Sequence, residues 1–309
     1  MKLHKNFWAI TCYFNPIGYG RRLTNYRIFR ERLAVPLVTV ELSHHHQFEL
    51  RPADADILVQ LHCEDVLWQK ERLLNIALQS VPSDCNTVAW LDCDMIFESN
   101  DWVARADELL ERFKIVFPFT HLYELPKDRL PEDADSRKST AYSLVYALQN
   151  GIAPPEVLRG NMLLNQRIAS GGAGVTRRDI LEKHGFYDAC VMGSGCRAMA
   201  CAALGRFDDA IHFLRMNRNW ADHYLAWAKP YFDTVEGNVA CLDGGMFHLW
   251  HGERIHRQYG ERHRLLMEFN FDPCKDIFID EKGCWRWRKN SSGAQELVRR
   301  YLESRREDG

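Results

Sequence analysis

Two aspartates, Asp92 and Asp94, directly follow an apolar run in the segment TVAWLDCDMIF, residues 87–97. A carboxylate between apolar runs is costly to bury unless a positive group pairs with it. In an α/β sheet, ligands collect beyond the carboxyl ends of the strands, where both aspartates would lie. Two carboxylates at this spacing can share one Mg²⁺ or Mn²⁺ ion and leave positions open for phosphate oxygens. We therefore favour a metal site over the simpler alternative, a strand-end turn with a helix N-cap nearby.

Two late histidines, His248 and His251 in HLWHG, could supply further ligands. Imidazole binds first-row metals such as manganese alongside carboxylates. If the segment stays extended, the two rings point to opposite faces and one reaches the metal; if the chain turns after Trp250, both can. We favour His251, because Gly252 lets its loop approach a ligand, and keep His248 second. The alternative for either ring is a core histidine bonded to the backbone.

Basic and amide side chains that could hold phosphate accompany both motifs. Arg72 and Asn75 lie on one face of a predicted helix, with Lys70 at its edge. Arginine pairs with phosphate oxygens through two hydrogen bonds at once, and the arginines that follow the histidines are Arg254, Arg257 and Arg262. For any single residue a solvated helix face is the simpler explanation, but their grouping around two metal-type motifs keeps a phosphate role open.

The elements that must position these residues alternate between strand and helix in the first half of the chain. Near-continuous apolar runs predict strands over residues 7–13, 36–42, 55–61, 87–91 and 114–119. Apolar residues at helical spacing predict helices over residues 21–33, 64–81 and 101–113. This alternation indicates an α/β fold with a mostly parallel central sheet that helices cover on both faces.

The second half of the chain is less regular. We expect a polar loop over 125–140, a turn over 170–175, and helices over 177–184 and 196–205. A short strand over 246–252, a basic helical segment over 253–269 and an amphipathic helix over 293–307 follow. Because no internal repeat or linker is evident, residues 1–309 are predicted to form a single domain. Its parts are a first half over 1–119, a second half over 120–270 and a C-terminal extension over 271–309.

The composition disfavours several classes of protein. The 309 residues carry a formal net charge of −2 and are 46% hydrophobic, so the chain can bury a large core and has no basic excess for nucleic acid. No apolar run reaches the ~18 residues of a transmembrane segment, and the short N-terminal apolar run lacks a small-residue cleavage site. The ten cysteines form no Cys-x-x-Cys pair, which disfavours a zinc ribbon. Reduced thiols predict a cytoplasmic protein.

Four segments, in order along the chain, resemble those of GT-A-fold glycosyltransferases of the family-2-like kind, which use nucleotide-diphosphate sugars. CYFNPIGYGRRLTNYRIF resembles the first strand and nucleotide-contacting loop, and WQKERLLNIAL with VAWLDCDMIF resembles the helix and strand that lead into the Asp-x-Asp motif. GGAGVTRRDILEKHGFYD resembles the acceptor-side segment, and HLWHGERIHRQYGERHRLL resembles the late histidine motif. Together they span about residues 7–270. The histidine pair is also similar to the paired late metal ligands of β-1,4-galactosyltransferase-like enzymes.

The resemblance implies a single GT-A-type domain, with nucleotide-sugar binding in 1–119 and the acceptor and metal histidines in 120–270. It implies metal-dependent transfer of a sugar from a nucleotide-diphosphate donor to a saccharide or other hydroxyl acceptor, with Mn²⁺ or Mg²⁺ stabilising the leaving diphosphate. Asp94 and His251 would hold the metal, and Asp92 would lie near it or near the donor ribose. The residues that would border the nucleobase are Tyr13, Phe14 and Asn15, and those that would orient the donor are Arg72 and Asn75.

One position departs from the family pattern. Such enzymes commonly carry an acidic residue after Gly-Phe-Tyr-Asp that deprotonates the acceptor hydroxyl, and here Cys196 stands at that position. A thiol with an ordinary pKa of about 8.5 is a poor replacement, and no activating partner is evident that would make Cys196 a nucleophile. We favour Asp188 as the stand-in base, with Asp222 as another. A retaining reaction that needs no such base, or a binder that transfers slowly, also stays open.

Two other function classes remain. A sugar nucleotidyltransferase also binds metal through an aspartate on an α/β sheet, but YFNPIGYGRR lacks the glycine-rich, basic pattern of its phosphate loop. A non-catalytic nucleotide-sugar-binding protein is suggested by Cys196. Hydrolysis of the donor with manganese separates that binder from an active enzyme.

Overall fold

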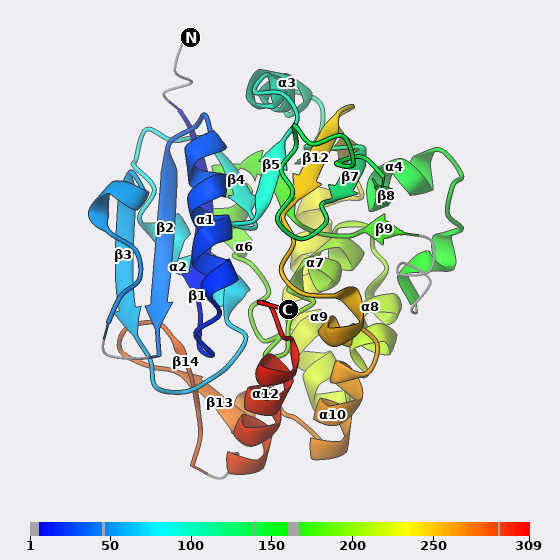
Figure 1. Ribbon diagram of the computed structural model, residues 1–309. Helices are drawn as coiled ribbons and strands as arrows, with labels where there is room; N and C mark the ends of the chain where they lie inside the picture. The colour runs from blue at the N-terminus through cyan, green and yellow to red at the C-terminus, as the bar shows by residue number, and fades with distance from the viewer. Residues whose placement is uncertain (1–5, 45–46, 139, 160–166, 290) are drawn as a thin grey trace.

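The main sheet has seven strands and is mostly parallel (Figure 1). The computed structural model describes residues 6–44, 47–138, 140–159, 167–289 and 291–309. Strand β10 runs antiparallel to both of its neighbours, β4 and β6, whereas the pairs within β1 to β4 are parallel. The predicted α/β class is confirmed. In order across the sheet, the strands are β11 (Val239–Cys241), β6 (Ile115–Phe117), β10 (Ala173–Arg177), β4 (Thr87–Leu91), β1 (Phe7–Phe14), β2 (Leu37–Ser43) and β3 (Ile57–His62).

Side chains of the central strands alternate between two apolar clusters, one on each face of the sheet. Ile10 and Phe14 of β1 belong to the cluster that includes the apolar side of α2. Phe7 belongs to the other cluster, where it packs edge-on against Trp102 of α3 with ring centroids 5.6 Å apart. Burial on both faces explains why these strands read as continuous apolar runs. The helices around this half are α1 (Gly20–Arg32), α2 (Lys70–Gln79), α3 (Trp102–Leu109) and α6 (Arg178–His184).

A second sheet of five strands brings the late histidines to the aspartates. Strand β5 starts directly after Asp94, and its Met95 pairs with His248 at the end of β12. These two strands are far apart in the sequence, so no local pattern predicts their pairing. In order, the strands are β5 (Met95–Phe97), β12 (Gly245–His248), β7 (His121–Glu124), β8 (Thr140–Ser143) and β9 (Ile168–Ala169).

Helices dominate the rest of the second half, and several differ from the sequence-based expectation. The helix expected over 64–81 begins at Lys70, because the preceding backbone is irregular and Trp68 N–H bonds to Val191 O at 3.0 Å. The turn expected over 170–175 continues as β10, which fills the sheet between β4 and β6. The segment expected to be helical over 253–269 is interrupted at Gln258, whose φ is +45°. The elements here are α4 (Leu144–Gln149), η2 (Pro155–Arg159), α7 (Gly195–Ala203), α8 (Phe207–Leu214), α9 (Arg218–Val235), η3 (Arg254–Arg257) and α10 (Arg262–Phe269).

The C-terminal extension returns to the middle of the molecule (Figure 1). The Tyr19 hydroxyl donates to Glu303 O at 2.8 Å, and the Asp308 carboxylate accepts from the N–H groups of Gly20 and Arg21 at 3.1 and 2.8 Å. These contacts tie the end of the chain to the start of α1. The elements of the extension are α11 (Pro273–Asp276), the hairpin of β13 (Ile277–Ile279) and β14 (Trp285–Trp287), and α12 (Ser292–Ser304).

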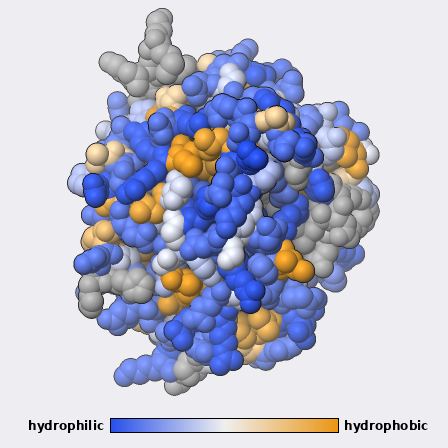
Figure 2. Space-filling view, viewed as in Figure 1, coloured by the Kyte–Doolittle hydropathy of each residue, from blue (hydrophilic) through white to orange (hydrophobic). Residues whose placement is uncertain are grey.

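The face seen in Figure 2 is mainly polar, and the cysteines are unpaired. Figure 2 shows a mainly hydrophilic face on which apolar side chains form small separate groups. Among the helices described, none combines the length and the apolar character that crossing a bilayer requires. All ten cysteines are free thiols, and most are buried.

Candidate active site

A cleft of about 300 Å³ lies at the carboxyl ends of β1 and β4, next to the second sheet. The N-terminal ends of α2 and α7, the chain that follows β12 and two residues of the C-terminal segment also line it. This is the position that an α/β sheet offers to ligands. The polar, charged and aromatic residues that line the cleft include Tyr13, Phe14, Arg22, Trp68, Lys70, Glu71, Asp92, Asp94, Glu124, Cys196, His248, His251, Arg254, Arg257, Arg262, Arg305 and Glu307.

Asp94, His248 and His251 converge on one point in the cleft. Asp94 Oδ2 lies 3.5 Å from the Nε2 atoms of both histidines, and the two Nε2 atoms lie 3.0 Å apart. Ligand atoms bound at ~2.1 Å to one ion, at angles between octahedral and tetrahedral, are separated by about 3.0–3.4 Å. Within the described residues, Asp94 Oδ1 is a buried oxygen with no hydrogen-bond partner. The donor set and its spacing therefore fit a divalent metal.

Local backbone geometry places both histidines. His248 is the last residue of β12, and Leu249 N–H then bonds to Asp94 O at 2.9 Å, which holds the following chain beside the aspartate. The chain turns after Trp250, and Gly252 adopts φ +88°, a conformation that favours glycine. A Cβ at Gly252 would lie 2.9 Å from the carbonyl oxygens of Arg305 and Arg306, so the C-terminal segment passes close over this turn. Both rings reach the aspartate because the strand ends at His248.

The charges around the triad suit metal ligands. Burial lowers the pKa of His251 well below its ordinary value, and Arg257 lowers it further, so the ring is neutral. Burial by itself raises the pKa of Asp94, but His248 and Arg257 outweigh it and hold that pKa below its usual range. A neutral imidazole and an ionised carboxylate are the forms that bind metal. His251 Nδ1 lies 4.0 Å from Glu307 Oε1 and 3.4 Å from Arg305 NH2, so the far side of this ring faces the charged groups of the C-terminal segment.

The first aspartate has a different positive partner. Asp92 forms an ion pair with Lys70 Nζ, and it does not belong to the triad. Burial alone lowers the pKa of Lys70, but the Asp92 carboxylate raises it well above its usual value, so Lys70 is charged. Lys70 Nζ also lies 3.0 Å from Cys196 Sγ. The predicted role of Asp92 beside the metal or the ribose stays a prediction.

The three residues predicted to border a nucleobase lie together at the end of β1. Tyr13 and Phe14 line the cleft, and the Tyr13 hydroxyl donates to Glu49 Oε2 at 2.6 Å. Asn15 Nδ2 donates to Glu49 Oε1 at 2.9 Å, so this amide is engaged by the protein. Phe14 packs edge-on against Trp68 with ring centroids 5.3 Å apart, which adds a second aromatic ring to this side of the cleft.

Arg72 and Asn75 do not line the cleft, and both bind Asp188. Arg72 NH1 and Asn75 Nδ2 lie 3.1 and 3.0 Å from Asp188 Oδ2. Arg72 Nε also donates to Gly283 O at 2.6 Å, and Asn75 Nδ2 to Phe186 O at 3.0 Å. None of the three lines the cleft. Their placement therefore gives no support to the expectation that Arg72 and Asn75 orient a donor or that Asp188 is the base, and it explains the Gly-Phe-Tyr-Asp segment as a structural anchor.

The other candidate base, Asp222, lies outside the cleft, and Arg254 and Arg262 each bind a side chain of the protein. The Asp222 side chain is 69% exposed on α9 and lies 3.9 Å from Arg218 Nε, outside the cleft. Arg254 pairs with Glu124 at 3.0 Å, and Arg262 NH1 donates to Tyr301 Oη at 2.6 Å.

Arg257 is the predicted phosphate-binding arginine that keeps donor capacity. It is only 5% exposed and lines the cleft. Its NH2 donates to Gly252 O and its NH1 to Tyr259 Oη, both at 3.2 Å. Among the described residues, its buried Nε has no partner.

Sequence reasoning missed a buried charge network beside the triad. Glu307 is 1% exposed and binds Arg22 Nε at 2.5 Å and Arg22 NH2 at 2.9 Å. Arg305 Nε binds the same carboxylate, and Arg305 NH2 lies 3.4 Å from His251 Nδ1. In the sequence these residues belong to charged stretches that look solvated, so no local signal distinguishes them.

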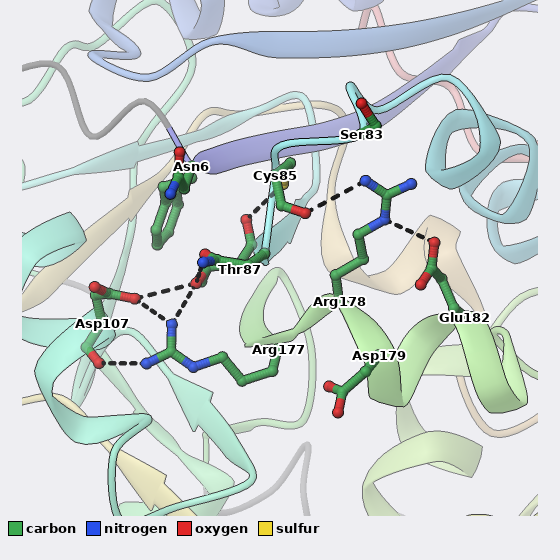
Figure 3. Close-up of a pocket in the computed structure, with 11 residues that line it drawn as sticks. Asn6, Ser83, Cys85, Thr87, Asp107, Arg177, Arg178, Asp179 and Glu182 are labelled. Carbon is green, nitrogen blue, oxygen red and sulfur yellow. Dashed lines mark hydrogen bonds and ion pairs between the residues drawn. The ribbon is translucent and has the colours of Figure 1, made fainter.

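A second, more open hollow lies near the opposite end of the sheet (Figure 3). Arg177 NH1 binds Asp107 Oδ1 and Thr87 Oγ1, both at 2.6 Å. Arg178 binds Glu182 at 2.8 Å and Pro82 O at 2.6 Å. Figure 3 shows both arginines turned toward acceptors of the protein, so their charges are already paired within the chain.

Comparisons with known proteins give matches among solved structures. No protein-family model matches the sequence, and no curated protein matches it. The chain is similar to glucosyl-3-phosphoglycerate synthase from Mycobacterium tuberculosis in complex with Mn²⁺, UDP-glucose and phosphoglyceric acid, with a TM-score of 0.42 and 12% identity over 92% of this chain and 86% of that chain. It is similar to a mannosyltransferase from Pyrobaculum calidifontis in complex with GDP-mannose and Mn²⁺, with a TM-score of 0.40 and 13% identity over 97% and 72% of the two chains.

A third similar structure belongs to another kind of enzyme. It is the 4-diphosphocytidyl-2C-methyl-D-erythritol synthase from Anaerococcus prevotii, with a TM-score of 0.33 and 12% identity over 77% of this chain and 86% of that chain. All three TM-scores lie below 0.5, so these structures are distant ones.

Proposed function

We propose that the chain is a metal-dependent glycosyltransferase that moves a sugar from a nucleotide-diphosphate donor to a hydroxyl acceptor. The observation that carries this proposal is the triangle of Asp94, His248 and His251 at the carboxyl end of β4, facing a cleft. One carboxylate and two imidazoles suit Mn²⁺ or another first-row metal and leave coordination positions for substrate oxygens. When bound, such a metal stabilises the negative charge that develops on a leaving diphosphate.

The chain's own groups around the triad favour an anionic ligand. Arg257 is buried beside the triad and keeps an unpartnered Nε among the described residues. Its fixed guanidinium could bind a diphosphate oxygen that also contacts the metal. On the other side, Phe14 and Trp68 offer aromatic rings against which a nucleobase could pack. A nucleoside diphosphate has the size and the two chemical ends that these groups would separate.

A second candidate, a nucleotide-sugar-binding protein without turnover, is favoured by one observation. Cys196 lines the cleft at the position where a carboxylate base is expected, and its Sγ is 3.0 Å from Lys70 Nζ. Burial raises the pKa of this thiol. A protonated thiol cannot take the proton of an acceptor, so an enzyme of this kind needs another base.

The proposal is tested first by binding. Calorimetry with UDP and with GDP, each with Mn²⁺ and again with excess chelator, should show metal-dependent binding of at least one nucleotide. Asp94→Asn should weaken that binding by more than tenfold because it removes a ligand charge. Asp222→Asn is the matched control, since Asp222 is exposed and outside the cleft. If Asp94→Asn binds as the wild type does, the metal assignment is wrong. Manganese-dependent release of nucleoside diphosphate from UDP- or GDP-hexoses then separates the enzyme from the binder.

A further inference from the structure

The cleft contains a carboxylate that the metal site does not use. Among the described residues, five carboxylates line the cleft: Glu71, Asp92, Asp94, Glu124 and Glu307. Four of them belong to the triad or form an ion pair within the chain. Asp94 belongs to the triad, Asp92 pairs with Lys70, Glu124 pairs with Arg254, and Glu307 pairs with Arg22 and Arg305. Glu71 is the one for which the described chain supplies no ion-pair partner.

Glu71 reaches the place where the expected base is missing. It is the second residue of α2 and is 3% exposed. Its carboxyl group packs against Gly195, the first residue of α7, and a Cβ placed on Gly195 would lie 2.2 Å from Glu71 Oε1. The carboxyl group therefore fills the space that a side chain at position 195 would occupy. A carboxylate thus lies next to Cys196. It comes from α2, whereas the family pattern predicts it on α7, at position 196 itself.

The surroundings of Glu71 suit proton exchange near neutral pH. Burial raises the pKa of Glu71 to about 7, with Lys70 opposing this effect and Asp92 and Asp188 adding to it. A general base is most effective when its pKa lies near the working pH. The titratable groups that face Glu71, on its own helix and on the elements packed against it, are Lys70, Asp92, Asp188, Cys12, Cys190 and Cys196.

We propose that Glu71 is the general base that deprotonates the acceptor hydroxyl. This assignment rests on the proposed glycosyltransferase function. In the step, the acceptor O–H proton moves to a Glu71 carboxylate oxygen as the acceptor oxygen forms a bond to C1 of the sugar. The bond between C1 and the diphosphate oxygen breaks, and its electron pair leaves with the nucleoside diphosphate. Because the attack is a single displacement, the configuration at C1 inverts. Water can replace the acceptor in the same step, which gives slow hydrolysis of the donor.

The test uses donor hydrolysis, so it does not need the natural acceptor. Wild type, Glu71→Gln and Glu71→Asp are assayed with Mn²⁺ and a panel of α-linked UDP- and GDP-hexoses at saturating donor between pH 5.5 and 9. Glu71→Gln should lower kcat by about 10²–10⁴-fold and leave the affinity for Mn²⁺ with nucleoside diphosphate within about twofold. The wild-type kcat should rise with pH through about 7, and this rise should be missing in Glu71→Gln. Nuclear magnetic resonance should show the β-anomer of the hexose first.

The controls keep the outcomes distinct. Glu182→Gln changes a glutamate at the opposite end of the sheet that pairs with Arg178, and it should leave kcat and its pH profile unchanged. Glu71→Asp keeps a carboxylate and should retain the pH dependence at a reduced rate, which also decides the matter if Glu71→Gln does not fold. A kcat within a few-fold of wild type in Glu71→Gln, or initial release of the α-anomer, would overturn the assignment.

Failure of the proposed function has a different signature. A wild type that binds Mn²⁺ with UDP or GDP but hydrolyses none of the donors would leave the binding site standing and reject Glu71 as a base. A wild type that binds neither nucleotide with Mn²⁺ would reject the glycosyltransferase proposal itself, and the base assignment with it.

Discussion

Glu307→Gln should destabilise the fold in a pH-dependent way. Glu307 is 1% exposed and binds both Arg22 and Arg305. Burial alone would raise the pKa of Glu307, but Arg22 and Arg305 outweigh it and lower that pKa from the ordinary 4.5 to about 2. Since one pH unit corresponds to 1.36 kcal/mol, the ionised carboxylate contributes about 3 kcal/mol to the free energy of unfolding at pH 7. The amide cannot replace this charge, so two buried guanidinium groups lose their counter-ion.

The sign of the pH dependence follows from the lowered pKa. The stabilisation is fully present above the unfolded pKa of 4.5 and is lost as the pH falls through the folded value of about 2. The difference between wild type and Glu307→Gln should therefore shrink from about 3 kcal/mol at pH 7 to about half of that at pH 3. At pH 7 the melting temperature should fall by about 5 °C, because the unfolding entropy scales with the length of the chain.

Urea denaturation at pH 7 and at pH 3, without metal, measures both quantities. Glu132→Gln is a matched control: Glu132 also binds an arginine, Arg32, but its side chain is 63% exposed. An exposed pair of this kind contributes no more than about 1 kcal/mol. The reasoning is refuted if Glu307→Gln is no less stable than Glu132→Gln, or if its deficit is as large at pH 3 as at pH 7.

Two further predictions concern the metal triad and the turn above it. His248→Ala and His251→Ala should each weaken binding of Mn²⁺ with nucleoside diphosphate by tenfold or more, because both rings lie 3.5 Å from Asp94 Oδ2; calorimetry that finds one variant unchanged would remove that histidine from the site. Gly252→Ala should lower the free energy of unfolding by more than about 1 kcal/mol, because its φ is +88° and a Cβ would lie 2.9 Å from two carbonyl oxygens. Limited proteolysis should then cut the C-terminal segment faster than in wild type, and equal stability and equal cleavage would contradict this account.

Features that depend only on residues adjacent in the sequence could be predicted without the structure. Apolar runs predicted β1, β2, β3 and β4 close to their observed bounds, because strands buried on both faces need continuous apolar residues. The position of Asp94 at the end of β4 is also local, since a residue that directly follows a strand must lie at its end. The turn after Trp250 was one of two open possibilities; Gly252 favoured His251 over His248, whereas the structure places both rings 3.5 Å from Asp94 Oδ2. These local features were enough to predict a metal-type site and its sheet.

The pairing of the charged side chains could not be predicted and emerges from the folded structure. Lys70 pairs with Asp92. Arg72 and Asn75 bind Asp188, although their spacing on one helix face had suggested that they bind the phosphates of a sugar donor. A charged residue in a helix looks the same in the sequence whether its partner is solvent, substrate or a distant carboxylate. The pairing of β5 with β12, the return of Glu307 to the triad and the approach of Glu71 to Gly195 all join segments far apart in the chain. Such contacts are fixed by packing of the whole domain, because burial makes an unpaired charge costly and selects the partner that lies within reach.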